Sequence, residues 1–368
     1  MNYAVVDPVY KAMQGDPRVK FYLIIGSGSS RAGDVYSEAG QTIQVISPAR
    51  AMLMKFDAYI AADFIWSTLP RGTRRIQMFH GVAGKYCNVY DTPERSMRDW
   101  DRLFFINPKR LRNFVSAGAI DDGSPAARLV GMPKVDCLVN GSLTRDSALE
   151  RLGIDGGRKT VVYAPTWSPY SSLVAMGEDL IRGLVSAGYA VIVKLHDRSR
   201  YPEYIHSAGV DWVARLGQLV ERSGGFIANG SDSCPYLMAA DVLVTDHSSV
   251  GFEYLLLDRP VVRIEMPELL TNTNVNPDYV ALLSDVSISV RDVKQAITAV
   301  ERSFAEPTRQ SAARRTVAAE LFSNPGKATS LAVREIYEVL ELDPPDGYKT
   351  TSKMSNCSLP SFAPKQSY

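Results

Sequence analysis

Short apolar runs, each separated from the next by a stretch of helical character, restrict most strongly how this chain can fold. In the first half such runs lie at Val19–Ile25, Ile43–Ile46, Ala58–Ala61, Ile76–Phe79 and Leu103–Ile106. Strands that are apolar on both faces and alternate with helices form parallel sheets with helices on both sides. The pattern therefore predicts a doubly wound α/β domain.

The same pattern begins again near Lys159. Apolar runs follow at Val161–Ala164, Ala190–Leu195, Val242–Thr245 and Pro260–Ile264. A chain of 368 residues has room for two domains of ordinary size. We therefore expect two Rossmann-like domains that face each other across a cleft, which is where such proteins usually bind their ligands.

The composition between these sets of strands predicts the domain limits. The polar segment Asn140–Gly157 contains Gly153, Gly156 and Gly157, and indicates a linker at 141–157 between domains at 1–140 and 158–342. The second domain would end in an amphipathic helix at Lys327–Leu342. From Asp343 the chain is rich in Pro, Ser and Lys, which predicts a disordered tail at 343–368.

Charge, cysteine content and hydropathy exclude several classes of function. A net charge of +1 argues against a general nucleic-acid binder. The four cysteines form no CxxC pair, so reduced thiols in a cytoplasmic protein are expected. No apolar run approaches the ~20 residues that cross a bilayer. Peripheral membrane association stays open because of two basic clusters, which are Arg71, Arg74 and Arg75, and Lys109, Arg110 and Arg112.

Two histidines follow predicted strands, one in each half of the chain. His80 is followed by Gly81, which lets the backbone approach a ligand closely, and His196 ends the sequence KLH. Open α/β sheets bind ligands at the carboxyl ends of their strands, so both imidazoles are expected at one cleft. Histidine suits general acid–base catalysis, although a structural role at a strand end is the alternative. His206, in a later loop, is expected to be solvated.

The strongest motif follows the strand VLVT. Asp246 and His247 come directly after it, and Ser248 and Ser249 open a short apolar helix that carries Glu253. Serine hydroxyls and the N–H groups at a helix N-terminus bind phosphate. Ordinary helix capping explains one serine but not the whole block. We therefore predict a phosphate-binding site here.

Two further turns are weaker candidates. The cluster at Gly26–Arg31 has Arg31 where a dinucleotide-binding fingerprint requires its third glycine, so a flexible turn is favoured over a site for an anionic acceptor. Thr166 follows the strand that ends at Ala164, and its hydroxyl suits a phosphate or a sugar. A plain strand-ending turn is the alternative.

Taken together, these motifs resemble the CDP-glycerol glycerophosphotransferases, the bacterial teichoic-acid primases and polymerases. The resemblance runs from about residue 75 to residue 340. It rests on His80-Gly81, GMPKVD at Gly131–Asp136, YAPTW at Tyr163–Trp167, KLH at Lys194–His196 and TDHSSVGFEYLLLDRPVV at Thr245–Val262.

The chain departs from the family pattern at three places. Val82, Ala83 and Gly84 replace the Thr-Pro-Leu that usually follows the HG motif. His247 stands where the family often has tyrosine, and Asp197 where it often has proline.

The resemblance implies a GT-B fold and transfer of glycerol phosphate from CDP-glycerol, with release of CMP, in cell-envelope polymer synthesis. The acceptor would be glycerol phosphate or a lipid-linked glycan. His80 and His196 would be catalytic, His80 as general base and a protonated His196 as an aid to the leaving phosphate. Substrate would be bound by Gly81, Thr166, Asp246, His247, Ser248, Ser249 and Glu253. No carboxylate cluster requires a divalent metal, and no cofactor is expected.

Two other functions stay open from the sequence. One is a GT-B nucleotide-sugar glycosyltransferase or epimerase, which a preference for UDP-sugars would indicate. The other is a non-catalytic nucleotide-binding homologue, against which the presence of both His80 and His196 argues.

Overall fold

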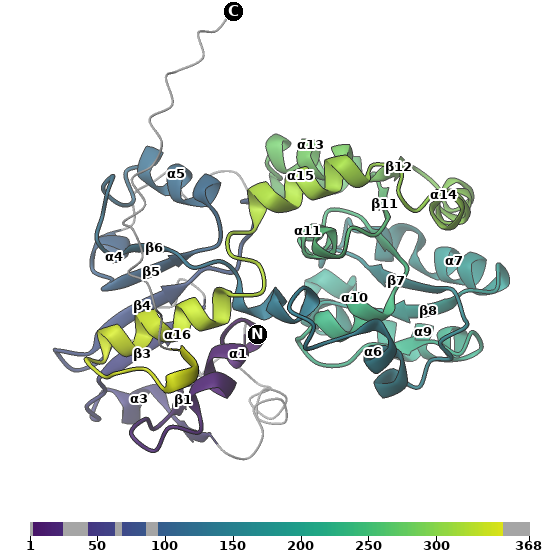
Figure 1. Cartoon of the computed structure of the whole chain (residues 1–368). Coiled ribbons are helices and arrows are strands. Elements are labelled where there is room, and N and C mark those ends of the chain that lie inside the picture. The colour runs from purple at the N-terminus through teal and green to yellow at the C-terminus, as the bar shows by residue number, and fades with distance from the viewer. Residues whose placement is uncertain (1–2, 25–42, 63–67, 86–94, 349–368) are drawn as a thin grey trace, which may run out of the picture.

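The computed structural model describes residues 3–24, 43–62, 68–85 and 95–348, which form two lobes (Figure 1). The first lobe contains the strands from the N-terminal part of the chain and the second contains the larger sheet. The glycine cluster at 26–31, Cys87 and Cys357 lie outside the described residues.

The first lobe contains a parallel sheet in the order β3-β4-β5-β6 and a separate parallel pair, β1-β2. In β5, Leu103 and Phe105 pack into one apolar cluster and Phe104 into another, so both faces of the sheet are covered. The elements are α1 (Tyr3–Met13), β1 (Tyr22–Ile24), β2 (Gln44–Ile46), α3 (Pro48–Ala51), β3 (Ala58–Ala61), β4 (Arg74–Met78), α4 (Arg95–Arg98), β5 (Arg102–Phe105), α5 (Pro108–Ser116) and β6 (Ala127–Leu129).

The second lobe contains a six-stranded parallel sheet in the order β12-β11-β10-β7-β8-β9. Its strands are β7 (Thr160–Ala164), β8 (Ala190–Val193), β9 (Phe226–Ile227), β10 (Val242–Thr245), β11 (Val261–Ile264) and β12 (Ile288–Val290). Its helices are α6 (Arg145–Leu152), α7 (Ser172–Ser186), α8 (Asp197–Arg200), η2 (Ile205–Ser207), α9 (Trp212–Glu221), α10 (Cys234–Ala239), α11 (Val250–Tyr254), η3 (Leu255–Leu257), α12 (Pro267–Thr273), α13 (Pro277–Asp285), α14 (Val293–Ala305) and α15 (Ser311–Leu321).

Helices cover both faces of this sheet. In β7, Val161 and Tyr163 pack with residues of α7, α9 and α14, whereas Val162 and Ala164 pack with residues of α6, α10, α11 and α13. The strand is fully buried, as an apolar run with no polar face requires. The prediction of a doubly wound α/β fold is confirmed.

The strand order reverses between β7 and its neighbour β10. Ligands of open α/β sheets bind outside the carboxyl ends of the strands at such a reversal. The turn that starts at Pro165 and the segment that starts at Asp246 follow these two strands, so the fold itself directs a ligand toward them.

The last long helix, α16 (Ala328–Val339), packs on the first lobe and not on the second. Val333 and Ile336 join the apolar cluster of Ile76, and Glu335 pairs with Arg102 and Arg128 at 3.2 and 2.9 Å. The amphipathic pattern predicts this helix correctly, but its predicted place was at the end of the second domain. Amphipathic periodicity shows that a helix buries one face, but not against which sheet.

Much of the predicted linker is a helix that packs on the second lobe. Thr144 and Ser147 form a capping box that starts α6, and Ala148 and Leu149 are buried in the second lobe's core. Gly153 ends the helix in the left-handed conformation, so it terminates a helix and is not evidence for a hinge. The limits at residues 140 and 158 stay predictions.

The predicted disordered tail begins with residues that contact the first lobe. The carbonyl of Asp343 accepts from Arg18, and a 3-10 turn, η4 (Asp346–Tyr348), carries Tyr348 against the first lobe's apolar cluster. The rest of the predicted tail, residues 349–368, lies outside the described residues.

Candidate functional site

One cavity of about 410 Å³ is lined by both lobes. Its wall contains the segments that follow β4, β7, β8 and β10, so the carboxyl ends of strands from both sheets meet there. Seven of the predicted site residues line it, namely His80, Gly81, Thr166, His196, Ser248, Ser249 and Glu253. The expected convergence of two histidines from different lobes on one cavity is therefore observed.

The ring of His80 is oriented by the neighbouring strand. Its Nδ1 lies 2.7 Å from the carbonyl oxygen of Ala62, the residue that follows β3. A carbonyl oxygen only accepts hydrogen bonds, so Nδ1 carries the proton and Nε2 carries the lone pair in the neutral ring. His80 is thus in the tautomer whose Nε2 can accept a proton.

The ring of His196 has the opposite tautomer. His196 caps α8, and its Nδ1 accepts the backbone N–H of Arg198 at 3.1 Å. The proton of the neutral ring is therefore on Nε2, which makes this nitrogen a donor. Desolvation in the cavity, and then the charges of Lys194 and Arg198, lower the pKa of His196. The expected protonated His196 is not what this geometry favours, because a proton on Nδ1 would break the cap.

Gly81 and Thr166 line the cavity from different lobes. A Cβ at Gly81 would meet no atom within 4 Å, so packing does not require a glycine there and the space belongs to the cavity. The hydroxyl of Thr166 accepts from the Lys85 ammonium at 3.1 Å. This bond joins the turn after β7 to the loop that follows His80.

Asp246 organises the site without lining the cavity. It is fully buried, and its carboxylate accepts the backbone N–H groups of Thr166, Ser172 and His247 at 2.8, 3.0 and 2.6 Å. The Ser172 hydroxyl donates to it as well, at 2.9 Å. The predicted substrate-binding carboxylate is thus fully engaged in holding the segment after β10 against the segment after β7.

His247 is also fully buried and does not line the cavity. Both its ring nitrogens lack a hydrogen-bond partner among the described residues. Burial lowers the pKa of His247 to about 4, which keeps the ring neutral. Its carbonyl accepts from the Tyr279 hydroxyl at 3.0 Å, which fixes the backbone just before Ser248.

Ser248 and Ser249 line the cavity at the start of α11. Ser249 is exposed and is the N-cap residue, but its side chain makes no capping bond. Simple helix capping therefore does not explain this hydroxyl. The helix has only five residues before it continues as η3, so its dipole is weak and the hydroxyls are the main donors that the motif offers.

Glu253 lines the cavity but is held by other residues. Its carboxylate oxygens lie 2.8 and 2.9 Å from the Lys134 ammonium, and Ser233 donates to it at 3.0 Å. Burial alone would lower the pKa of Lys134, but the Glu253 carboxylate outweighs it and raises that pKa. Lys134 lies in η1 (Pro133–Leu138), which also contacts α1 and α16, so the pair connects the two lobes.

Four further cations line the cavity that were not predicted as site residues: Lys85, Arg110, Lys134 and Lys194. Burial lowers the pKa of Lys85 and of Lys194 to about 8. The carboxylates on the wall are Asp197 and Glu253, and Glu253 is paired with Lys134. The cavity is therefore cationic and suits an anionic ligand. The sequence could have indicated two of these cations, because Lys85 follows the HG motif closely and Lys194 directly precedes the LH motif.

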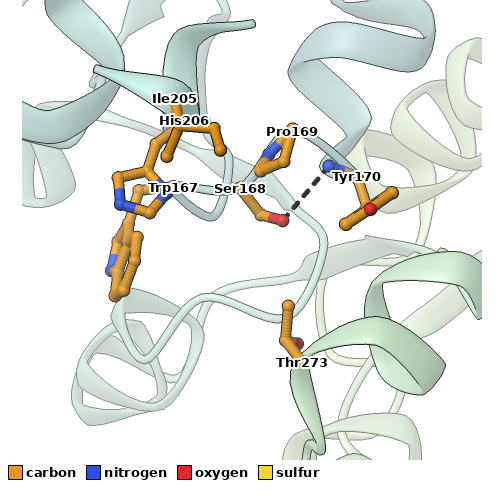
Figure 2. Close-up of a pocket in the computed structure, with 7 residues that line it drawn as sticks. All are labelled: Trp167, Ser168, Pro169, Tyr170, Ile205, His206 and Thr273. Atoms are coloured by element: carbon orange, nitrogen blue, oxygen red, sulfur yellow. Dashed lines mark hydrogen bonds between the residues drawn. The ribbon is translucent and has the colours of Figure 1, made fainter.

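A second, smaller pocket of about 280 Å³ adjoins the cavity at Trp167, which lines both (Figure 2). The Arg198 guanidinium lies over the Trp167 ring at 4.6 Å, and His206 contacts the ring edge-on at 4.6 Å. His206, which was expected to be solvated, is half-buried, because the loop after α8 folds back onto Trp167. Ile205 and Tyr170 form exposed parts of the rim of this smaller pocket.

The described residues show neither a metal-ligand cluster nor a helix of membrane-spanning character. No group of three or more His, Cys, Asp or Glu side chains that could hold a metal ion occurs among them. None of their helices combines the length and the apolar character that crossing a bilayer needs.

The geometry can be compared with known protein families. The family model described as CDP-Glycerol:Poly(glycerophosphate) glycerophosphotransferase matches residues 9–324. A teichoic acid poly(glycerol phosphate) polymerase from Bacillus spizizenii is 25% identical over 223 residues, which is 54% of this chain and 53% of that protein. A teichoic acid glycerol-phosphate primase from Bacillus subtilis is 32% identical over 111 residues, or 28% of this chain and 25% of that protein. The chain thus spans about half the length, or less, of these relatives.

Solved structures of low sequence identity share the fold. The wall teichoic acid polymerase TagF has a TM-score of 0.63 at 18% identity, over 92% of this chain and 86% of TagF. A putative UDP-N-acetylglucosamine 2-epimerase from Listeria monocytogenes has a TM-score of 0.54 at 11% identity, over 94% of this chain and 95% of that chain. The predicted GT-B type of fold is confirmed.

The Lys134–Glu253 pair leads to a stability prediction. Glu253→Gln leaves the Lys134 ammonium buried without its counter-charge, so the free energy of unfolding should fall by about 3 kcal/mol in urea denaturation. The matched control is Glu178→Gln, which loses the surface pairs to Arg182 and Arg215 and should hardly change stability. Equal effects of the two substitutions would show that the pair does not hold the lobes together.

Proposed function

Since the chain belongs to the CDP-glycerol:poly(glycerophosphate) glycerophosphotransferase family, we propose that it transfers glycerol phosphate from CDP-glycerol to an acceptor hydroxyl and releases CMP. The product would be a cell-envelope polymer of the teichoic-acid type. The reaction would take place in the cytoplasm, at the inner face of the membrane.

The observation that carries the proposal is the pair of histidines. His80 comes from the first lobe with Nε2 as an acceptor, and His196 comes from the second with Nε2–H as a donor. Transfer of a phosphoryl group between two oxygens needs a proton to be accepted at the attacking oxygen, and charge to be neutralised at the leaving oxygen. Two rings with opposite proton positions on one cavity match these two needs.

The donor would lie against the second lobe. Ser248 and Ser249 offer hydroxyls to the diphosphate, and Lys194 adds a cation beside His196. Asp246 supports this wall indirectly, because it fixes the backbones of Thr166 and His247 on either side of it. One solved TagF structure was obtained after a soak with CDPG, which is consistent with a CDP-glycerol donor in this fold.

The chemical step is an in-line displacement at the phosphorus that bears glycerol. Nε2 of His80 takes the proton of the acceptor hydroxyl as that oxygen bonds to phosphorus. The bond from this phosphorus to the bridging oxygen breaks, and CMP leaves with that oxygen. His196 Nε2–H and the Lys194 ammonium stabilise the charge that develops on the leaving phosphate. Such a step depends on positioning and charge neutralisation more than on covalent help from the protein.

Substitution of His80 tests the assignment of the base. His80→Ala should lower CMP release in the presence of acceptor by about 10²- to 10⁴-fold, while the Kd for CDP-glycerol stays close to that of the unchanged protein. His206→Ala is the control, because His206 does not line the cavity. Retention of most of the activity by His80→Ala would rule out His80 as the base.

Turnover of UDP-N-acetylglucosamine instead of CDP-glycerol would favour a nucleotide-sugar enzyme.

The lysines of the cavity predict how donor binding depends on pH. Lys85 and Lys194 have a pKa of about 8, so both are charged below that pH and both lose a proton above it. Of the two, Lys194 lies beside the proposed donor diphosphate. A neutral lysine must take up a proton to bind an anion, so the Kd for CDP-glycerol should rise about tenfold per pH unit above pH 8 through Lys194. Calorimetry on His80→Ala, which should not turn the donor over, measures this directly. A constant Kd from pH 7 to pH 9 would contradict the assignment.

A further inference from the structure

The basic cluster formed by Lys109, Arg110 and Arg112 does not present one surface. Arg112 is exposed and Lys109 lies 4.0 Å from Glu320, whereas Arg110 is only 2% exposed and lines the cavity. The sequence analysis considered the three as a basic face for a membrane. The structure instead places one of them inside the candidate active site, on the wall that carries His80.

The position of Arg110 is fixed by the start of α5. The Asn107 side chain accepts the Arg110 N–H at 2.8 Å and donates to the carbonyls of Val82 and Leu321 at 2.8 and 2.7 Å. Asn107 is fully buried, so these bonds hold the helix start against both the loop after His80 and α15. The Arg110 guanidinium lies over the Phe114 ring one turn later, at 5.3 Å.

The loop after His80 approaches this guanidinium closely at Gly84. Gly84 has φ +68°, and a Cβ there would lie 2.7 Å from the Arg110 Nη1. A side chain at position 84 would therefore have to displace the guanidinium, as well as adopt a backbone conformation that L-residues rarely take. The close approach brings Gly84, Lys85 and Arg110 to one part of the wall.

We propose that Arg110, together with Lys85, forms an anion subsite on the first-lobe wall that binds a phosphate group of the acceptor. This subsite is separate from the donor diphosphate site at Ser248 and Ser249, and it rests on the proposed function. A guanidinium offers five N–H donors in one plane, so it binds a phosphate strongly while it keeps contacts within the protein. No described first-lobe residue on the cavity wall carries a carboxylate that would repel such a group.

The subsite specifies the class of acceptor. His80, the proposed base, lies on the same wall and receives the acceptor hydroxyl, so the recognised phosphate must be close to that hydroxyl in the acceptor. A glycerol phosphate end has both groups separated by three carbon atoms. A phosphate-bearing alditol end, of the kind that the family description names, therefore fits this subsite better than a neutral sugar does.

Two acceptors that differ only in the phosphate test the subsite. The unchanged protein should release CMP with sn-glycerol 3-phosphate at a much higher kcat/KM than with glycerol. Arg110→Gln should lower kcat/KM for sn-glycerol 3-phosphate by about 10- to 100-fold and leave that for glycerol and the Kd for CDP-glycerol close to unchanged. Arg110→Lys should recover part of the loss, because charge is kept without the planar donor set. Gly84→Ala should act like Arg110→Gln in direction.

Arg112→Gln is the matched control, since Arg112 is on the same helix but exposed. It should leave kcat/KM unchanged for both acceptors. An equal loss with both acceptors, or no loss with either, would overturn the subsite. Calorimetric binding of sn-glycerol 3-phosphate in the presence of CMP separates the two proposals. If the unchanged protein binds it and Arg110→Gln does not, the subsite stands even where CDP-glycerol is not turned over. If the unchanged protein and Arg110→Gln bind sn-glycerol 3-phosphate equally well, the subsite is wrong, whichever nucleotide donor the protein uses.

Discussion

The contact between the partly buried Lys134 ammonium and the buried Glu253 carboxylate, 2.8 Å apart, is the interaction on which the site most depends. It joins η1 to α11 on the cavity wall. The Lys85–Thr166 bond and the bond from the Asn276 N–H to the Lys85 carbonyl, at 2.8 Å, join the lobes on the other side of the His80 loop. These links hold the carboxyl ends of two separate sheets at the same cavity, and without them neither sheet alone carries a complete site.

In this cavity the tautomers of the two imidazoles are fixed by hydrogen bonds to backbone groups and not by charged partners. The Ala62 carbonyl holds one proton on His80 Nδ1, and the Arg198 N–H excludes a proton from His196 Nδ1. Both orienting groups are neutral, so they fix the proton positions without adding a carboxylate to a cavity that must receive an anionic donor. Asp246 likewise adds no negative charge to the cavity wall. Its carboxylate accepts backbone N–H groups from two loops and does not line the cavity.

The sequence was most informative about strands and about the positions that follow them. The strands at Ala58–Ala61 and Val242–Thr245 have the predicted bounds, because continuous apolar runs between turns leave little choice. The short strands β6, β9 and β12 were not predicted, since two or three residues show no periodicity. Strand ends also located His80 and His196 correctly. What a side chain contacts was not predictable, because Asp246 binds Thr166 and Ser172, which lie 80 and 74 residues away, and Glu253 binds Lys134, which lies 119 residues away. In the same way, the sequence did not show that Arg110 faces the cavity, because its position depends on contacts with Asn107 and Gly84.

The most direct test of the central claim is nitrogen NMR of the two imidazoles in the full chain at neutral pH, assigned with His80→Ala and His196→Ala. We expect opposite tautomers, with the proton of the neutral His80 ring on Nδ1 and the proton of the neutral His196 ring on Nε2. Addition of CMP should shift the His196 resonances more than those of His80. Two rings of the same tautomer, or a His196 that is protonated at neutral pH, would contradict the account.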